Sequence, residues 1–357
     1  MFREKTFKAV NSSAGSPAVA RLAVWLGFGA LLGLVLTRRR ECFSFQGRTV
    51  VITGGSRGLG LLMARQLARE GARLALLARN VDELRNAEIE LAKTGATVLA
   101  IRCDIRKRDQ VEHAIQRIVV AFGRIDVLIN NAGVIQVGPL EHLTCEDFEQ
   151  AMAIHFFGPL YAILAVLPHM REAVGGGRMV NIASIGGKIG LPHLAPYSAS
   201  KFALVGLSDS LRAELRRQNI RVTTVLPGPM RTGSPPNAHF KGRHQAEYAW
   251  FALGDALPVL SINADRAARK IIEACRRGAP RLTLGVQTKA AILLNELFPG
   301  TSARLTALAN QLLPAPDPGG SKQLYSGWES QSALVPSWLT TLSDRATAEN
   351  NEHPACG

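Results

Sequence analysis

A tyrosine and a lysine four residues apart are the side chains in this sequence best suited to acid–base chemistry. Tyr197 and Lys201 lie in YSASKFALVGLSDSLRAELRRQ, whose apolar spacing predicts a helix, so both would share one face. A phenol, with an ordinary pKa of about 10, is a poor base at neutral pH. A neighbouring ammonium favours the phenolate by Coulomb attraction, so the pair predicts proton transfer at a substrate oxygen. Taken alone, this spacing is also typical of an ordinary helix-surface pair.

A glycine-punctuated turn follows the first apolar run of the chain. Residues 49–60 read TVVITGGSRGLG, a predicted strand that runs into a turn and then a helix. Gly54 would permit the tight turn, Gly58 would let the backbone approach a pyrophosphate, and Gly60 would let the helix pack against the strand. The helix N-terminus offers free N–H groups to the phosphates. A turn without a ligand is the alternative, but its place after the first strand favours phosphate binding.

The elements that must position these residues follow an alternating pattern from Gly47 onward. Apolar runs that predict strands lie at 49–53, 73–78, 97–103, 125–130, 178–183, 220–226 and 281–285, and helical patterns lie at 58–70, 81–93, 107–121, 146–170 and 196–218. Continuous apolar strands separated by helices predict a parallel sheet covered on both faces. The expected fold class is therefore α/β, a Rossmann-type doubly wound sheet with its ligand crevice at the carboxyl ends of the strands.

Five motifs along residues 48–285 arrive in an order that resembles the short-chain dehydrogenases/reductases. The first, TGGSRGLG, is similar to the TGxxxGxG fingerprint of that family. The others are Cys103-Asp104-Ile105 after the third strand, Asn130-Asn131-Ala132-Gly133 after the fourth, Ser184 followed by Tyr197 and Lys201 in YxxxK spacing, and Pro227-Gly228-Pro229-Met230-Arg231-Thr232. Their combination is far more specific than any one of them.

The resemblance implies an enzyme that interconverts a carbonyl and an alcohol with a nicotinamide cofactor. Tyr197 would be the acid/base, Lys201 would also bind the nicotinamide ribose, and Ser184 would hydrogen-bond the substrate oxygen. Asp104 would contact the adenine amino group, and Thr232 the nicotinamide carboxamide. The cofactor-binding residues expected in total are Gly54, Ser56, Arg57, Gly58, Leu59, Gly60, Arg79, Asp104, Ile105, Asn131, Ala132, Gly133, Tyr197, Lys201, Pro227, Gly228, Met230 and Thr232.

The end of the second strand favours NADP(H) over NAD(H). An NAD site places a carboxylate there to hold the ribose 2′-hydroxyl. Here that position is Ala78, followed by Arg79, and Arg57 lies in the glycine turn. Guanidinium groups form charge-assisted forks with phosphate oxygens, which suits a 2′-phosphate. The alternative is that both arginines are solvated surface residues.

His155 is the one departure from the family pattern. It stands in EDFEQAMAIHFFGPLY where the family has a catalytic Asn that helps anchor a water between the lysine and bulk solvent. An imidazole can donate or accept a hydrogen bond, so the relay could persist and titrate near neutral pH. Alternatively, the ring only packs and a backbone carbonyl holds the water. We list His155 with Ser184, Tyr197 and Lys201 as a candidate catalytic residue.

An uninterrupted apolar run near the N-terminus predicts a membrane anchor. Residues 22–36 read LAVWLGFGALLGLVL and are followed, after Thr37, by Arg38-Arg39-Arg40. Fifteen residues are short for a span, but extension back through Ser16 gives about twenty. The arginines favour a catalytic domain that faces the cytoplasm. A cleaved signal, which would need a small-residue cleavage site, and a helix that lies on the membrane are the alternatives.

Charge and cysteine content exclude two further kinds of site. The net charge is +14, but residues 1–48 contribute +6 and residues 314–357 contribute −3, and the rest is scattered. With 6% aromatic residues and no basic stripe among them, we expect no nucleic-acid binding. The five cysteines have no CxxC or zinc-type spacing, so reduced thiols and no metal site are expected.

Four parts of the chain are expected. They are a basic segment and anchor at 1–45, the dinucleotide-binding domain at 46–285, apolar C-terminal helices at 286–313 and a poorly ordered tail at 314–357. The helices at 286–313 could pack on the domain or face a membrane. The apolar stripe of 196–218 resembles a subunit interface of the family, which implies a homo-oligomer, either a dimer or a tetramer.

The substrate is expected to be hydrophobic, such as a lipid-, steroid- or retinoid-like carbonyl or alcohol. This expectation depends on the anchor and on a presumed lid at 229–260 that contains Phe240, Trp250, Phe251 and Leu253. Two alternatives remain open. One is an NADP(H)-binding sensor or scaffold at a membrane with little turnover, suggested by His155, and the other is a lipid-binding module.

Overall fold

The computed structural model describes residues 43–173, 175–256, 261–317, 322–331, 347 and 350–352. The apolar run at 22–36, the predicted anchor, lies outside the described residues. From Phe43 onward the chain forms one compact unit, so the segment 286–313 belongs to the same unit as the predicted dinucleotide-binding part.

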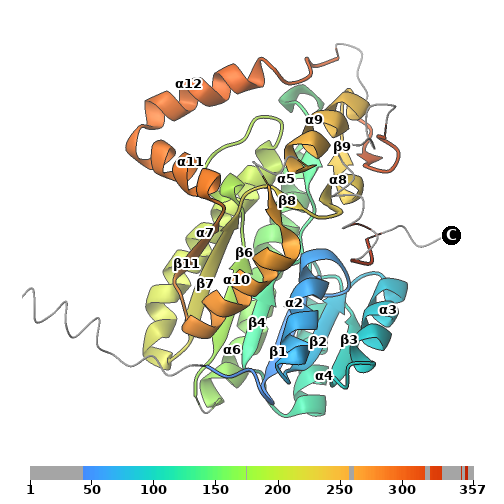
Figure 1. Ribbon diagram of the computed structural model, residues 1–357, viewed down its shortest axis with the longest axis vertical. Helices are drawn as coiled ribbons and strands as arrows, with labels where there is room; N and C mark the ends of the chain where they lie inside the picture. Colours follow the sequence, from blue (N-terminus) through green and yellow to red (C-terminus); the bar gives the residue numbers. More distant parts are fainter. Residues whose placement is uncertain are drawn as a thin grey trace, which may run out of the picture. The chain divides into compact units, whose positions relative to one another are not determined.

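Seven parallel strands form the central sheet, in the order β11-β7-β6-β4-β1-β2-β3 (Figure 1). They are β1 (Thr49–Thr53), β2 (Arg73–Ala78), β3 (Val98–Arg102), β4 (Val127–Asn130), β6 (Arg178–Ile182), β7 (Arg221–Pro227) and β11 (Arg281–Leu284). The sheet grows outward from β1 in both directions, so its topological switch point lies between β1 and β4. All five residues of β1 are buried, as expected of a strand covered on both faces.

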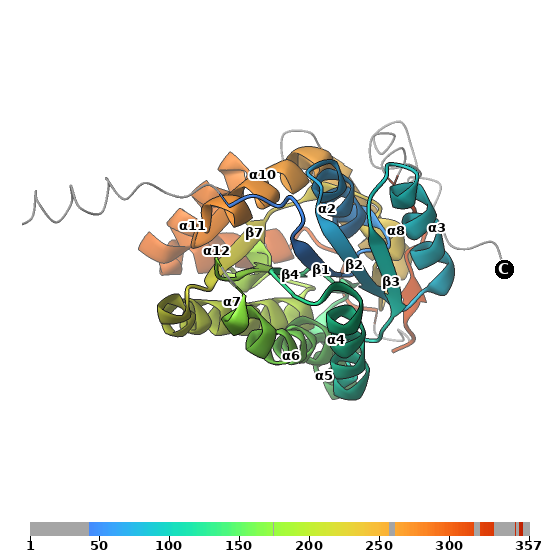
Figure 2. The same cartoon turned by 90° about the horizontal axis from the view of Figure 1, so that it is seen from below.

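Three helices cover each face of this sheet (Figure 2). One face carries α2 (Gly58–Arg69), α3 (Val81–Ala92) and α10 (Ala264–Arg277), and the other carries α4 (Arg108–Phe122), α6 (Gly158–Glu172) and α7 (Ala195–Leu215). Fully buried Leu67 of α2 and Ile271 of α10 belong to the first core, and Ile118 of α4 and Val166 of α6 to the second. Each such side chain contributes about 1.5–3 kcal/mol by burial. The prediction of a parallel sheet with flanking helices is confirmed.

Smaller elements lie beyond the carboxyl ends of the strands. The segment after β7 forms β8 (Met230–Arg231), α8 (Ser234–Asn237), β9 (His239–Phe240) and α9 (His244–Ala256). Strand β9 pairs with β5 (Gln136–Val137) and β12 (Tyr325–Ser326), and β8 pairs with β10 (Ile262–Asn263). Helices α5 (Cys145–Met152), η1 (Leu140–His142), η2 (Ala153–Phe157) and η3 (Ile185–Gly187) complete the region, and η4 (Arg216–Gln218) joins α7 to the amino end of β7.

The chain after β11 forms two helices in the segment where the sequence predicted them. Helices α11 (Val286–Leu297) and α12 (Pro299–Asn310) form an arm that leads away from the sheet in Figure 1. The tail after Pro314 was expected to be poorly ordered, yet β12 joins a sheet and residues 350–352 contact the glycine turn. Composition did not predict this order because both contacts are made with residues far away in the sequence.

One helix among the described residues is long and apolar enough to cross a membrane. It runs over Cys145–Glu172 and includes α5, η2 and α6. Ala162, Ile163, Val166 and Met170 are fully buried in the core. The same length and composition are typical of a core helix, so this segment does not take the place of the predicted anchor.

Candidate active site

The glycine turn between β1 and α2 depends on backbone shapes that only glycine adopts easily. Gly54 and Gly58 have φ angles of 65° and 54°, in the left-handed region. A Cβ on Gly60 would collide with the carbonyl oxygen of Gly54 and lie 2.8 Å from the Asn131 amide nitrogen. Side chains at these positions would therefore close the turn or push α2 away from it. The neighbouring Leu59 is buried in the core and fixes the start of α2.

Thr53, the last residue of β1, ties this turn to the end of β4. Its hydroxyl oxygen accepts hydrogen bonds from the backbone N–H groups of Asn131 at 3.0 Å and Ala132 at 3.2 Å. The Asn131 side chain donates to the Gly54 carbonyl at 3.0 Å. The switch point is thus closed by polar contacts between two adjacent strands, which holds the glycine turn rigid.

A buried polar chain links the sheet to the helix that carries Tyr197. The Asn130 side chain donates to Asn181 Oδ1 at 2.9 Å, and Asn181 donates to the Ser208 hydroxyl at 2.8 Å. Ser208 in turn donates to the Leu204 carbonyl at 2.7 Å. Because buried polar groups are costly to leave unpaired, this chain fixes how α7 lies on β4 and β6.

Ser184, Tyr197 and Lys201 lie together at the carboxyl end of β6. Ser184 follows the strand and accepts a hydrogen bond from the Gly186 N–H at 3.1 Å. Tyr197 and Lys201 lie one turn apart on α7, with the Lys201 ammonium 5.6 Å from the centre of the Tyr197 ring. That ammonium donates to the Ile182 carbonyl at 2.9 Å.

Burial dominates the ionisation of these groups. It raises the pKa of Tyr197 to about 12, against a hydrogen bond with Ser184 that lowers it, and it lowers the pKa of Lys201 to about 7. We expected the lysine to lower the tyrosine pKa, but desolvation of the phenolate is the largest cause here and the shift is upward. The phenol is the form present at neutral pH, which suits donation of a proton to a carbonyl oxygen.

His155 occupies a single π-helical turn, η2, and both its ring nitrogens have protein partners. Nε2 accepts a hydrogen bond from the Val134 N–H at 3.2 Å, so Nδ1 carries the proton and donates to the Ser200 hydroxyl at 2.8 Å. Ser200 donates onward to the backbone carbonyl of Tyr197 at 2.8 Å. Burial, then the charge of Lys201, lowers the pKa of His155 well below its usual value.

These contacts change the role expected for His155. A neutral imidazole with both nitrogens engaged has no free position for a relay water, and its low pKa removes the titration near neutral pH. The ring also meets Tyr197 edge to face, with centroids 5.3 Å apart. His155 is therefore a positioning residue that links the loop after β4 to Tyr197.

The adenosine end of the crevice contains a carboxylate that the sequence analysis missed. Glu83, in the first turn of α3, accepts a hydrogen bond from Ser56 at 2.9 Å and pairs with Arg57 at 3.3 Å. Arg57 also donates to Asn237 at 2.6 Å. The expectation that no carboxylate opposes the two arginines is thus wrong for Arg57. Arg79 is exposed, and within the described part of the chain no hydrogen bond or ion pair holds it.

Asp104 lies after β3 and is already engaged by a neighbour. Both its oxygens receive hydrogen bonds from the Arg106 guanidinium, at 2.6–3.0 Å, and this contact lowers the Asp104 pKa. An adenine amino group would have to share this carboxylate with Arg106. The adjacent Ile105 is buried and packs where Gly158 leaves room.

The segment after β7 closes the other end of the crevice. Pro227 ends the strand, and a Cβ on Gly228 would collide with the hydroxyl of Thr288 on α11. Met230 lies in β8, and the buried Thr232 hydroxyl is 2.6 Å from that of Ser234. The segment is therefore fixed from both sides, and Gly228 is required by a close approach.

A carboxylate from the C-terminal segment lies in the glycine turn. Glu352 accepts a hydrogen bond from the Gly233 N–H at 2.7 Å, and its other oxygen lies 2.8 Å from where a Cβ on Gly58 would be. The Gly58 N–H donates to the Asn350 carbonyl at 3.0 Å. These oxygens stand in for those of a phosphate. The turn thus has the space and the donors that a pyrophosphate needs, and the residues present fit a dinucleotide.

The residues packed beside Tyr197 are mainly apolar and come from β9 and α9, and α9 also carries two buried acids, Glu247 and Asp255. Phe240, Trp250 and Phe251, from the segment predicted to be a lid, pack in one cluster with Tyr197. Asp255, near the end of α9, is 9% exposed, and burial raises its pKa to about 8. Its charge acts on Tyr197 and raises the pKa of the phenol. Asp255 is thus the acidic group that α9 brings near the reacting centre.

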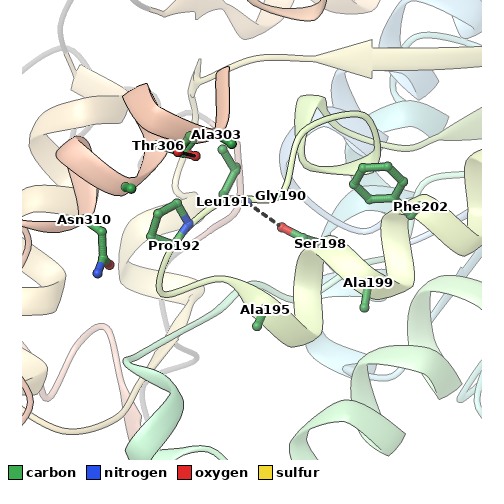
Figure 3. A pocket seen from close by; sticks show the side chains of 11 residues that line it. Gly190, Leu191, Pro192, Ala195, Ser198, Ala199, Phe202, Ala303, Thr306 and Asn310 are labelled. Carbon is green, nitrogen blue, oxygen red and sulfur yellow. Dashed lines mark hydrogen bonds between the residues drawn. The ribbon is translucent and has the colours of Figure 1, made fainter. Parts of the chain in front are cut away.

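The two hollows described in the structure lie beside the reacting residues. The first, of about 550 Å³, separates α12 from residues 190–202 (Figure 3). Ala303 and Thr306 of α12 face Leu191 and Ser198 across it. The second, of about 500 Å³, continues toward Pro314. Neither is lined by Ser184, Tyr197 or Lys201.

The sequence analysis missed Glu83, Asp255 and Glu352. For Glu83 a signal existed, since Asn80 caps α3 and places an acid in its first turn, next to the glycine turn. For Asp255 and Glu352 no local pattern indicated the site, because each reaches it only through the tertiary fold.

Comparisons with known proteins agree with this geometry. The family model described as short chain dehydrogenase matches residues 48–239. "Putative oxidoreductase SadH" of Mycobacterium tuberculosis is 33% identical over 74% of this chain and 95% of its own length. L-Sorbose reductase from Gluconobacter frateurii, solved with NADPH and L-sorbose, is 26% identical with a TM-score of 0.61, covering 69% of this chain and 97% of that one.

A short-chain dehydrogenase/reductase from Burkholderia phymatum, solved with NAD, shares the fold at 23% identity and a TM-score of 0.65, covering 72% of this chain and 96% of that one. The two solved structures carry different nicotinamide cofactors, so the preference of this chain has to be argued from its own residues. The matched family model and the similarity to the mycobacterial protein show that the chain belongs to the short-chain dehydrogenase/reductase family of oxidoreductases.

Proposed function

We propose that this protein is an NADP(H)-dependent oxidoreductase that interconverts a carbonyl and an alcohol on a hydrophobic substrate. The observation that carries the proposal is the group formed by buried Ser184 and Lys201 with partly buried Tyr197, beside a glycine turn whose N–H groups already donate to oxygen acceptors. A structural helix-surface pair would leave Tyr197 and Lys201 in water, whereas here burial shifts the pKa of both.

The chemistry divides between cofactor and protein. When bound, the nicotinamide supplies or accepts a hydride at the substrate carbon. Tyr197, a phenol at neutral pH, donates its proton to the carbonyl oxygen during reduction and accepts it during oxidation. The Ser184 hydroxyl hydrogen-bonds the same oxygen, and the Lys201 ammonium stabilises the phenolate left behind.

The cofactor preference is proposed from Arg79. This guanidinium follows β2, is exposed and has no partner in the described ranges, so it is available to a 2′-phosphate. Arg57 contributes less, because Glu83 and Asn237 already hold it.

The proposed substrate is hydrophobic because α9 covers the reacting end with aromatic and aliphatic side chains. Purified protein should oxidise NADPH with aliphatic, steroidal or keto-lipid carbonyls, and Tyr197→Phe serves as the control. No NADPH oxidation and no single-turnover hydride transfer with any carbonyl would favour the alternative, a cofactor-binding sensor or scaffold.

We also propose contact with membrane lipid, which rests on the apolar arm. Large apolar side chains are exposed along this arm. The exposed fraction is 61% for Leu297 at the end of α11, 58% for Phe298 between the two helices and 84% for Leu312 after α12. Deletion of residues 1–40 should give a soluble, cofactor-binding protein if the run at 22–36 is the anchor, with the catalytic domain facing the cytoplasm. If the shortened chain still sediments with membranes after a salt wash, attachment resides in this arm.

A homo-oligomer is proposed on a different surface. Phe157 and Leu164, around the start of α6, and Phe202 on α7 are exposed large apolar residues on the helices opposite α2 and α10. Light scattering of the purified protein should show a dimer or tetramer, and Phe202→Glu should shift it toward the monomer. A monomer without the substitution would contradict this.

A further inference from the structure

Three residues near the C-terminus cross the crevice from its adenosine end. The side chain of Asn351 donates hydrogen bonds to the backbone carbonyls of Ser56 at 3.0 Å and Glu83 at 3.1 Å. Asn351 itself has a positive φ of 57°, a backbone shape that Asn tolerates better than most residues. The segment is thus held by the glycine turn before α2 and by the first turn of α3.

Asn350 accepts a hydrogen bond from the first backbone N–H group of α2. Its carbonyl accepts the Gly58 N–H at 3.0 Å, and its side-chain oxygen accepts from Arg65 at 3.0 Å. The first N–H groups of a helix have no partner within the helix, which is why this position attracts phosphates. Here a peptide carbonyl satisfies it.

Glu352 lies deepest, between the glycine turn and the segment after β7. It is 5% exposed, accepts the Gly233 N–H at 2.7 Å, and its backbone carbonyl accepts from Asn237 at 3.1 Å. Among the described residues no salt bridge to a Lys or Arg is formed by its carboxylate. Burial raises the pKa of Glu352 to about 7, because it disfavours the charged carboxylate, although the hydrogen bond from Gly233 favours it.

We infer that the glycine turn is also a binding site for the chain's own segment Asn350–Glu352, which competes with the dinucleotide for the same donors and space. The inference rests on the proposed nicotinamide function. The Gly58 N–H cannot donate fully to both ligands, and the Glu352 oxygen fills the space that Gly58 leaves open for a pyrophosphate. Cofactor affinity is then reduced by the fraction of molecules in which the segment is bound.

The test compares full-length protein with Glu352→Ala and with Glu149→Ala, a matched control at an exposed acid on α5. NADPH binding is followed by cofactor fluorescence. Loss of the Glu352 carboxylate should lower the NADPH Kd by about tenfold, and the control should leave it unchanged. Without cofactor, the backbone amides of Gly58 and Gly233 should exchange hydrogen faster in Glu352→Ala.

Three results would overturn the competition. An unchanged NADPH Kd would show that the segment does not limit cofactor binding. A weaker Kd in Glu352→Ala would show that the segment closes over bound cofactor instead of displacing it. If neither protein bound NADPH while exchange at Gly58 still responded to the substitution, the segment would dock, but the competition and the proposed function would both fail.

Discussion

The two ends of the crevice are built in different ways. At the reacting end, Lys201 and His155 are at most 5% exposed, and each is held by hydrogen bonds that involve backbone groups. At the adenosine end, Arg57 is held only by other side chains, and Arg79 is exposed. Backbone contacts are fixed by the fold, whereas side-chain pairs can be exchanged by single substitutions. We therefore expect the proposed reaction to depend on the fold, and the proposed cofactor preference to depend on a few surface charges.

The largest expected effect lies at the reacting end. Tyr197→Phe should lower turnover by roughly 10²–10⁴-fold, because the proton donor is removed. The NADPH Kd should stay within a few-fold, since the hydroxyl serves the reaction. Lys201→Ala should damage both quantities. Steady-state kinetics and fluorescence titration measure them, and a Tyr197→Phe protein with more than about a tenth of the original rate would disprove the assignment.

Substitutions at the adenosine end should have a smaller effect, on cofactor affinity, because only side-chain charges are changed there. Arg79→Ala should weaken NADPH binding by about tenfold and leave NADH binding nearly unchanged, because only NADPH carries the 2′-phosphate. Arg57→Ala is the matched comparison and should cost less, since Glu83 competes for that guanidinium. Adding Ala78→Asp to Arg79→Ala should erase or reverse the preference. Equal affinities for NADPH and NADH in the unmodified protein would refute the proposal.

Substitution of His155 tests whether its hydrogen bonds to Val134 and Ser200 stabilise the reacting end. His155→Asn should lower the free energy of unfolding by about 1–3 kcal/mol, because a shorter side chain cannot satisfy both Val134 and Ser200. The pH–rate profile should keep its shape, since the imidazole is already neutral across the assayed range. Denaturant titration and pH–rate profiles give the two readouts. Loss of an ionisation near pH 6.5 in the variant would instead restore the relay role.

The smallest expected effect concerns Asp255. Its pKa is raised to about 8, so the carboxyl is neutral below that pH and negative above it. The negative charge raises the Tyr197 pKa and makes loss of the phenolic proton harder. Above pH 8 the rate of alcohol oxidation should therefore be a few-fold lower than in Asp255→Asn, which lacks this charge. Carbonyl reduction by the same proteins at pH 7 is the control and should not change.

The sequence predicted the parts of the site that depend on local backbone shape and short spacing. One turn requires Gly54, Gly58 and Gly60, and one helix carries Tyr197 and Lys201. Each set lies within a short stretch of sequence, so each could be found from its spacing alone. The alternating apolar runs likewise predicted the seven-stranded sheet, because its central strands, such as β1 and β4, are buried on both faces.

What the sequence did not predict depends on contacts between distant segments. The tautomer of His155 follows from Val134 and Ser200, which lie 21 and 45 residues away. Glu352 reaches Gly233 across 119 residues. The direction of the Tyr197 pKa shift could not be predicted either, since it follows from burial, and burial is a property of the whole fold.

The glycine turn and the segment Asn350–Glu352 lie far apart in the sequence, which has a consequence during synthesis. Thr53, Gly58, Asn131 and Gly233 are all translated well before Asn351, which bonds to Ser56 across 295 residues. At ribosomal rates of about 5–20 residues per second, the stretch after Gly233 takes roughly 6–24 seconds to appear. For that interval a nascent chain carries every donor of the phosphate site but not the segment that occupies it. The segment Asn350–Glu352 therefore reaches the glycine turn only after every residue that it contacts there has been translated.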